Sequence, residues 1–285
     1  MSSQTFYAKL EDRWNDDKFV CIGLDIDVDK IPQSLNTEMD IVSRVTLFNQ
    51  KIVEATHSYA CAYKLNSAHY EKLGESGLRA LKLSIKHIKD SYPGIPVILD
   101  AKRGDIGDTN KYYAEAAFDE LEADAITVHP YIGRESLTPF LSRTDKGVIV
   151  MGANSADGAG EFQDLVVGED DQPLYLYICR RVATEWNEHG NCAVTASAND
   201  LEKLGSIREA VGEMPLLLLG VGAQGGDVKE CVQRGVAKQS FGLIINSSRA
   251  IIYASDGDDF AEAATRAASG LNTQIIEAYR LHATV

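Results

Sequence analysis

Short apolar runs rich in β-branched residues alternate with amphipathic segments along almost the whole chain. We predict eight strands, at residues 19–26, 61–66, 96–101, 124–129, 147–152, 192–197, 215–222 and 241–246. The segments between them, such as residues 108–123 and 226–235, carry apolar residues at helical spacing. Eight strand–helix units in one chain predict a single closed parallel (β/α)8 TIM barrel, with a doubly wound open sheet as the alternative.

The longest interval between predicted strands begins at residue 153 and carries several glycines and the acidic run GEDD. We expect a long loop here, followed by a helix over residues 174–190. The loop is either a solvated surface insertion or a cover over a ligand, because barrel chemistry sits at the carboxyl ends of the strands. No Pro/Gly/Ser-rich linker or internal repeat interrupts the alternation, so we expect residues 1–285 to form one domain.

Composition narrows the class of partner. The chain has 285 residues, 45% of them hydrophobic, and a formal net charge of −14, which argues against nucleic acid or an anionic membrane surface as a partner. An anionic substrate would therefore need a locally basic pocket. The first residues show no apolar signal segment and no stretch is long enough to span a bilayer, so we expect a cytoplasmic protein.

The cysteines and histidines indicate no metal or nucleophile site. The five cysteines form no Cys-x-x-Cys pair, and we interpret them as small buried apolar residues in a reducing compartment. Of six histidines, only His129 lies at the end of a predicted strand, where a structural role is the simpler interpretation. Neither a metal-ligand spacing nor a Ser-His-Asp arrangement can be assembled.

Charged residues gather at the carboxyl ends of three neighbouring strands. Asp100 and Lys102 stand two residues apart, so in a strand they share one face and point into the barrel mouth. Lys64 and Asp25 end the second and first strands in the same way. A salt bridge would explain any one of these residues, but four of them at the face that carries barrel chemistry predict an active site.

Two glycine- or serine-containing turns predict a phosphate site. Residues 220–227 (GVGAQGGD) follow the seventh strand, and residues 246–251 (NSSRAI) follow the eighth. Loops at these positions of a barrel often bind phosphate through backbone N–H groups and helix N-termini. Arg249 adds a bidentate donor that suits phosphate oxygens.

These segments together resemble the orotidine 5′-phosphate decarboxylase family, in the branch often called type 2. The resemblance covers residues 18–253, and its most specific piece is DAKRGDIGDT, which matches the family signature Asp-x-Lys-x-x-Asp with its downstream threonine. The supporting pieces are IGLDID, FNQKIVEATHSYACAYKLNSAHYE, TVHPYIG, GVGAQGGD and NSSRAI. The order of the pieces, each on its expected strand, makes the resemblance specific.

The resemblance implies decarboxylation of orotidine 5′-monophosphate to uridine 5′-monophosphate and carbon dioxide, with no metal or organic cofactor. It implies that Lys102 protonates C6 of the pyrimidine, that Asp100 lies beside the departing carboxylate, and that Lys64 holds Asp100 and a ribose hydroxyl. It further implies a homodimer with shared active sites. Asp105 would reach into the neighbouring subunit's active site as a catalytic residue, with Thr109 beside it on the ribose. The remaining implied roles are ribose binding by Asp25 and phosphate binding by Gln224 and Arg249.

One segment departs from the family pattern. Where the family offers a serine to the pyrimidine after the fifth strand, this chain has Ala153, followed by Asn154 and Ser155. Either neighbour could take over the contact.

Two other functions compete with this interpretation. Sister enzymes on the same barrel, which act on 3-keto-gulonate or hexulose phosphates, carry Asp-x-Lys-x-x-Asp but use magnesium with an acidic residue on the second strand, where this chain has Lys64. A catalytically silent phosphate-ligand sensor is the second alternative. Such a protein would have no need for two lysines and two aspartates in one cluster.

Overall fold

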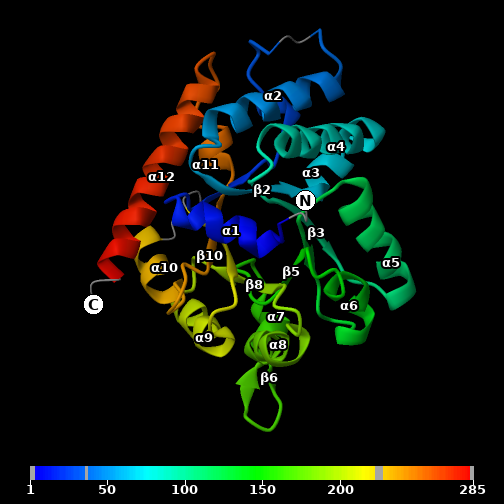
Figure 1. Ribbon diagram of the computed structural model, residues 1–285, viewed down its shortest axis with the longest axis vertical. Coiled ribbons are helices and arrows are strands. Elements are labelled where there is room, and N and C mark those ends of the chain that lie inside the picture. The colour runs from blue at the N-terminus through cyan, green and yellow to red at the C-terminus, as the bar shows by residue number, and fades with distance from the viewer. Residues whose placement is uncertain (1–3, 36–37, 222–226, 283–285) are drawn as a thin grey trace.

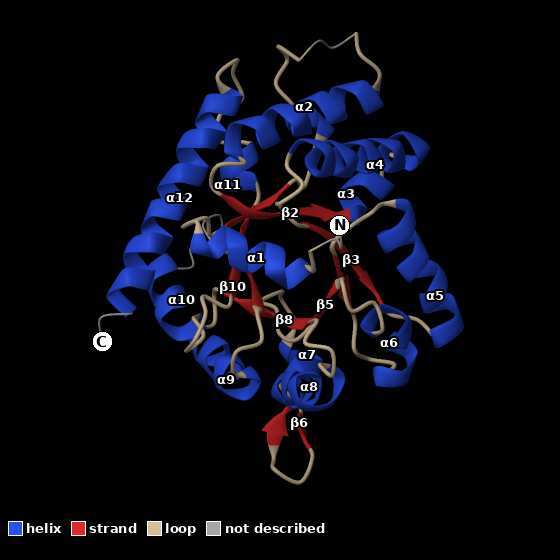
Figure 2. Ribbon diagram, viewed as in Figure 1, coloured by secondary structure: helices blue, strands red, loops and turns tan. Residues whose placement is uncertain are grey.

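The computed structural model describes residues 4–35, 38–221 and 227–282 of the chain. Its centre is a ring of parallel strands closed in the order β1-β10-β9-β8-β5-β4-β3-β2 (Figure 2). Their bounds are β1 Val20–Gly23, β2 Ala60–Asn66, β3 Val97–Arg103, β4 Ala125–Val128, β5 Gly147–Val150, β8 Cys192–Ser197, β9 Leu216–Leu219 and β10 Leu243–Ser247. Each predicted strand overlaps one of these, so the barrel prediction is confirmed and the open sheet is wrong.

Helices surround the ring, because each strand is apolar on both faces and needs a covering layer. They are α2 Ile41–Thr56, α3 Ser67–Glu71, α4 Gly74–Ser91, α5 Gly107–Glu115, α6 Arg134–Leu141, α8 Leu174–Arg181, α9 Leu201–Val211, α10 Val228–Gly235, α11 Arg249–Ile252 and α12 Phe260–His282. Single π-helical turns, Ala116–Glu120 and Val182–Trp186, extend α5 and α8, and a 3₁₀ turn, Val28–Lys30, follows β1. The predicted helices at residues 108–123, 174–190 and 226–235 correspond to α5, α8 and α10.

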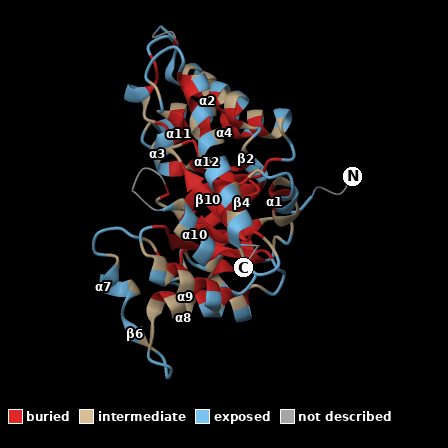
Figure 3. Ribbon diagram, turned by 90° about the vertical axis from the view of Figure 1, so that its left-hand side faces the viewer, coloured by how far each residue is buried: buried red, intermediate tan, exposed pale blue. Residues whose placement is uncertain are grey.

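The core occupies the ring and the inner faces of the helices, as the buried strands in Figure 3 show. All five cysteines are free and buried, which confirms their interpretation as apolar packing residues. No helix in the described part of the chain is both long and apolar enough to cross a membrane.

Helix α1 (Phe6–Asn15) lies across the amino-terminal end of the barrel (Figure 1). Thr5 caps it by accepting a hydrogen bond from the N–H of Ala8. Lys9 then pairs with the buried carboxylate of Asp124 at 2.9 Å, directly before β4. This helix covers the amino-terminal end, so the carboxyl ends of the strands form the open mouth of the barrel.

The interval after β5 is more ordered than the predicted long loop. It contains the short helix α7 (Gly160–Gln163) and an antiparallel hairpin of β6 (Val166–Val167) and β7 (Gln172–Pro173). The acidic GEDD run forms the hairpin tip, which projects from the body of the protein (Figure 3). Val166 in this hairpin is 64% exposed.

Candidate active site

The four charged residues predicted at the strand ends form one continuous chain of ion pairs, which we call the charge chain: Asp25, Lys64, Asp100 and Lys102. Lys64 Nζ lies 3.2 Å from Asp25 Oδ1 and 3.2 Å from Asp100 Oδ2. Lys102 Nζ lies 2.6 Å from Asp100 Oδ1. Asp25 follows β1 by two residues instead of ending it, because the strand stops at Gly23. The charges alternate, so each ammonium has a carboxylate beside it.

Side-chain exposure increases along the charge chain from Lys64 to Lys102. The side chain of Lys64 is 2% exposed and that of Asp100 is 6%, whereas the side chain of Lys102 is 35% exposed. Burial alone would raise the pKa of Asp100, but the charges of Lys64 and Lys102 outweigh burial and lower that pKa to about 2. Burial likewise opposes the charge on Lys64, yet Asp25 and Asp100 together raise the pKa of Lys64. The result is a charged, rigid cluster whose accessible end is the Lys102 ammonium.

The backbone at Lys102 departs from regular strand geometry. Leu99 of β3 pairs with Ile126 of β4 and Arg103 pairs with Val128, so three residues of β3 face a single residue of β4. Within this bulge Lys102 has a φ of +48°, which costs a non-glycine residue roughly 1–2 kcal/mol. Asp100 and Lys102 therefore meet as predicted, but across a bulge instead of along a regular strand.

Two hydroxyl residues that the sequence analysis did not single out complete the charge chain. Thr127 in β4 donates from Oγ1 to Asp100 Oδ1 at 2.9 Å. Ser248, just after β10, donates from Oγ to Asp25 Oδ2 at 2.8 Å. The only sequence signal for Thr127 is one polar residue in the apolar run AITV, and Ser248 stands beside Arg249.

Gly23 makes room for Ser248. A Cβ at Gly23 would lie 1.8 Å from Ser248 Oγ and 2.8 Å from Ser248 Cβ. We expect Gly23→Ala to lower the free energy of unfolding by about 2 kcal/mol, because overpacking forces neighbours apart. Urea unfolding measures this effect.

The matched control is Gly94→Ala, because a Cβ at Gly94 meets no atom within 4 Å. Adding Ser248→Gly to Gly23→Ala should recover most of the loss, since it removes both atoms in the way. A loss that persists in the double variant would contradict this contact as the cause.

Asp105 lies outside the charge chain. Its backbone is held by the buried side chain of Asn110, which accepts from the N–H of Asp105 at 3.0 Å and donates to its carbonyl at 2.6 Å. Its carboxylate accepts the N–H of Ile106 at 2.7 Å. Thr109 is half-buried in the first turn of α5. Within one subunit, none of the described interactions joins Asp105 or Thr109 to Lys102.

Only part of the predicted phosphate-binding site lies within the described residues. Arg249 is exposed and begins α11, while Gln224 lies outside the described residues. Asp227 accepts the N–H groups of Lys229 and Glu230, so its carboxylate already occupies the first turn of α10. Arg249 therefore stays the predicted phosphate-binding residue in the described part of this region.

Asn154 and Ser155 both follow β5 at the open mouth. The side-chain oxygen of Asn154 accepts the N–H of Ala156 at 3.0 Å, which leaves the amide NH₂ of Asn154 as a donor. Ser155 Oγ accepts from Asn199 Nδ2 at 3.3 Å and keeps its own O–H. Both residues therefore retain a donor.

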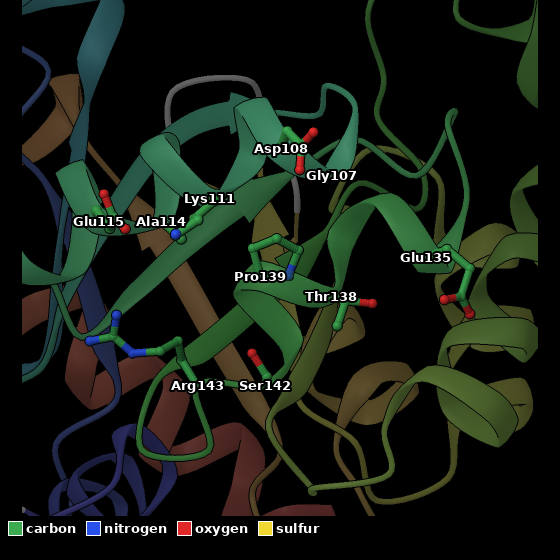
Figure 4. A pocket seen from close by; sticks show the side chains of 10 residues that line it. All are labelled: Gly107, Asp108, Lys111, Ala114, Glu115, Glu135, Thr138, Pro139, Ser142 and Arg143. Atoms are coloured by element: carbon green, nitrogen blue, oxygen red, sulfur yellow. The ribbon is translucent and has the colours of Figure 1, made fainter.

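A separate cavity lies on the outer layer of helices. Asp108 and Lys111 of α5 line one side of it, and Thr138, Pro139 and Ser142 line the other (Figure 4). No member of the charge chain lines it, so we assign the chemistry to the barrel mouth. Within the described ranges, no three His, Cys, Asp or Glu side chains are grouped in a way that could hold a metal ion.

The chain is similar to known proteins over most of its length. The model of the "Orotidine 5'-phosphate decarboxylase / HUMPS family" matches residues 18–264. The orotidine 5′-phosphate decarboxylase of Cellvibrio japonicus is 45% identical over 272 residues, which are 95% of this chain and 98% of that protein.

Two solved structures from Leishmania donovani share the fold. Its OMP decarboxylase superposes with a TM-score of 0.80 at 32% identity, over 95% of this chain and 99% of that one. Its UMP synthase superposes with a TM-score of 0.82 at 34% identity, over 94% of this chain. This chain spans only 57% of the UMP synthase chain.

Proposed function

The chain belongs to the orotidine 5′-phosphate decarboxylase / HUMPS family, and from this premise we propose that it is the lyase that converts orotidine 5′-monophosphate to uridine 5′-monophosphate and carbon dioxide. The observation that carries the proposal is the charge chain, whose accessible end is an ammonium backed by a buried carboxylate. We further propose that residues 1–285 act as one catalytic domain without a metal or organic cofactor.

The chemistry follows from the order of the charges. The bond between C6 and the carboxylate carbon breaks, carbon dioxide leaves, and the electron pair remains on C6. A preorganised ammonium at Lys102 stabilises that negative charge and then donates its proton to C6. Lys102 recovers a proton from water after the product leaves, so the enzyme returns to its starting state.

Asp100 has two roles in this scheme. Its charge keeps the Lys102 ammonium in place, at 2.6 Å, and it faces the substrate carboxylate, which favours departure of carbon dioxide over the bound ground state. Lys64 neutralises the other oxygen of Asp100 and offers a further N–H to a ribose hydroxyl. Asp25, held by Lys64 and Ser248, accepts from the ribose.

Binding of the remote groups supplies the energy that positions the base. We assign the phosphate to Arg249 and Gln224, and the pyrimidine edge to the donors of Asn154 and Ser155. These contacts lie away from C6, so their binding energy can be used for orientation and closure. The lysines and Arg249 also provide the local basic surface that an anionic substrate needs on a chain of net charge −14.

A spectrophotometric assay tests the proposal. Mixing the protein with orotidine 5′-monophosphate should remove the orotate absorbance, and a chelator should leave the rate unchanged. Activity that a chelator abolishes and magnesium restores would indicate the sugar-phosphate branch of the family instead. Binding of uridine 5′-monophosphate without any turnover would indicate a phosphate-ligand sensor.

We also propose that two copies share their active sites. Asp105 and Thr109 lie beside exposed apolar residues, which suits an interface with a second copy. These exposed residues are Ile106, Tyr112, Tyr113, Tyr131 and Ile132, with Tyr131 95% exposed. In this arrangement Asp105 of one subunit reaches the Lys102 of the other.

Mixing two inactive variants tests the shared site. Lys102→Ala and Asp105→Ala subunits, exchanged at equal amounts, should recover about a quarter of the wild-type activity, because half of the dimers are mixed and each has one intact site. The control pair is Lys102→Ala with Asp100→Ala, whose mixed dimers have no intact site because both residues belong to the same half-site. Equal recovery of activity in both mixtures would refute the shared active site. So would the absence of recovery in the mixture of Lys102→Ala and Asp105→Ala subunits despite demonstrated subunit exchange.

A further inference from the structure

We infer that Thr127 is a positioning residue, whose single hydroxyl sets both the backbone of Lys102 and the carboxylate of Asp100. Thr127 is fully buried in β4, in the run Ala125–Val128. Its Oγ1 accepts the N–H of Lys102 at 2.9 Å and donates to Asp100 Oδ1 at 2.9 Å. One hydroxyl can do both, since it has one donor and two acceptor sites.

The strand register explains why this hydroxyl is needed. Between the pairs Leu99–Ile126 and Arg103–Val128, Thr127 is the only residue of β4 opposite three residues of β3. The regular ladder is interrupted there, so the N–H of Lys102 takes a side-chain acceptor in place of a backbone carbonyl. The bond fixes the N–H of a residue whose φ is +48°.

The same hydroxyl sets the direction of the carboxylate. Asp100 Oδ1 receives Thr127 Oγ1 and Lys102 Nζ, while Asp100 Oδ2 receives Lys64 Nζ. The neutral donor at Thr127 restricts rotation of the carboxylate about its last bond. The position of Lys102 in the barrel mouth is therefore fixed at two points. Its backbone N–H bonds to Thr127, and its ammonium bonds to the carboxylate that Thr127 orients.

A buried threonine with a purely structural role would have different consequences. Such a residue would affect how much protein folds, and the folded fraction would keep its turnover number. A positioning residue affects the geometry of Lys102 and Asp100 in every folded molecule. In the proposed decarboxylation, on which the kinetic test rests, this geometry matters for the step at C6 and little for the phosphate and ribose contacts.

The test is Thr127→Val, which keeps the shape and removes the hydroxyl. We expect kcat to fall about 10- to 100-fold, as for loss of a hydrogen bond to a charged group, with KM and the affinity for uridine 5′-monophosphate within about threefold of wild type. Thr127→Ser restores the hydroxyl and should return kcat to within about threefold. If Thr127→Val does not fold, Thr127→Ala removes the same hydroxyl and should give the same separation of kcat from KM.

The matched control is Thr56→Val, which also removes a fully buried hydroxyl, in this case one bonded to the carbonyl of Ile52 and to Tyr63. It should lower stability and leave kcat unchanged. A kcat for Thr127→Val equal to that of Thr56→Val, or no recovery in Thr127→Ser, would overturn the inference.

A crystal structure of Thr127→Val tests the same inference without any substrate, so its result is independent of the proposed reaction. We expect the Lys102 backbone to leave the left-handed region or the contact between Lys102 Nζ and Asp100 Oδ1 to lengthen beyond 2.6 Å. An unchanged backbone together with an unchanged contact would overturn the inference even if the protein proved inactive on orotidine 5′-monophosphate.

Discussion

Replacing Lys102 by alanine should lower turnover of orotidine 5′-monophosphate by roughly 10⁴-fold or more, because the change removes both the proton donor and the charge that stabilises the carbanion. Lys102 is the exposed end of the charge chain, and no other ammonium of that chain is accessible to the same degree. Stopped assays with long incubation measure the residual rate.

Binding should survive this change. The phosphate and ribose contacts come from other residues, so the affinity for uridine 5′-monophosphate, measured by calorimetry, should stay within about tenfold of wild type. The matched control is Lys86→Ala, since Lys86 is an exposed lysine of α4 that pairs with Asp90 at 3.0 Å. Near-normal turnover in Lys102→Ala would contradict the assignment of Lys102 as the proton donor.

Replacing Asp100 by asparagine should destabilise the protein by about 3–5 kcal/mol at pH 7, because it leaves a buried ammonium with one fewer carboxylate. Among the described ion pairs, Lys64, which is 2% exposed, would retain only the one with Asp25, and Lys102 would lose the contact at 2.6 Å. Urea unfolding measures the change, and turnover should fall as well. The exposed Asp90→Asn is the control and should have little effect on either.

This destabilisation should depend on pH with a defined sign. The pKa of Asp100 lies at about 2 in the folded protein, below the ordinary 3.8, so the unfolded chain takes up the proton more readily. The ionised carboxylate therefore stabilises the fold above about pH 4, and this contribution is lost as the pH falls towards 2. The stability difference between wild type and Asp100→Asn should narrow by about 1 kcal/mol between pH 7 and pH 3. A difference that widens in acid would contradict the lowered pKa.

The elements that could be predicted from the sequence are those set by local pattern. Eight apolar runs separated by amphipathic segments identify the eight barrel strands, because a strand covered on both faces must be apolar throughout. The four charged residues could also be predicted as site residues, since charged residues stand out in apolar runs. The hairpin of β6 and β7 was missed because two-residue strands carry no period.

The contacts that hold the charge chain could not be predicted, because they join residues distant in the sequence. Ser248 meets Asp25 across 223 positions, and Thr127 meets Asp100 across 27. Both depend on which strands become neighbours and in what register. The bulge at Lys102 is likewise a property of the β3–β4 pair and not of β3 alone.

The sequence by itself determined the barrel, the family and the four charged residues, because periodicity, motif order and the presence of ionisable groups are properties of the linear amino-acid sequence. Only the tertiary structure decided that the charges alternate along one chain of ion pairs and that Lys102 has a positive φ within a bulge. It also decided that Thr127 holds the carboxylate of Asp100 and that Ser248 holds that of Asp25. The reason is physical: a hydrogen bond or ion pair depends on distances of a few ångströms, and closure of the barrel alone brings those atoms together.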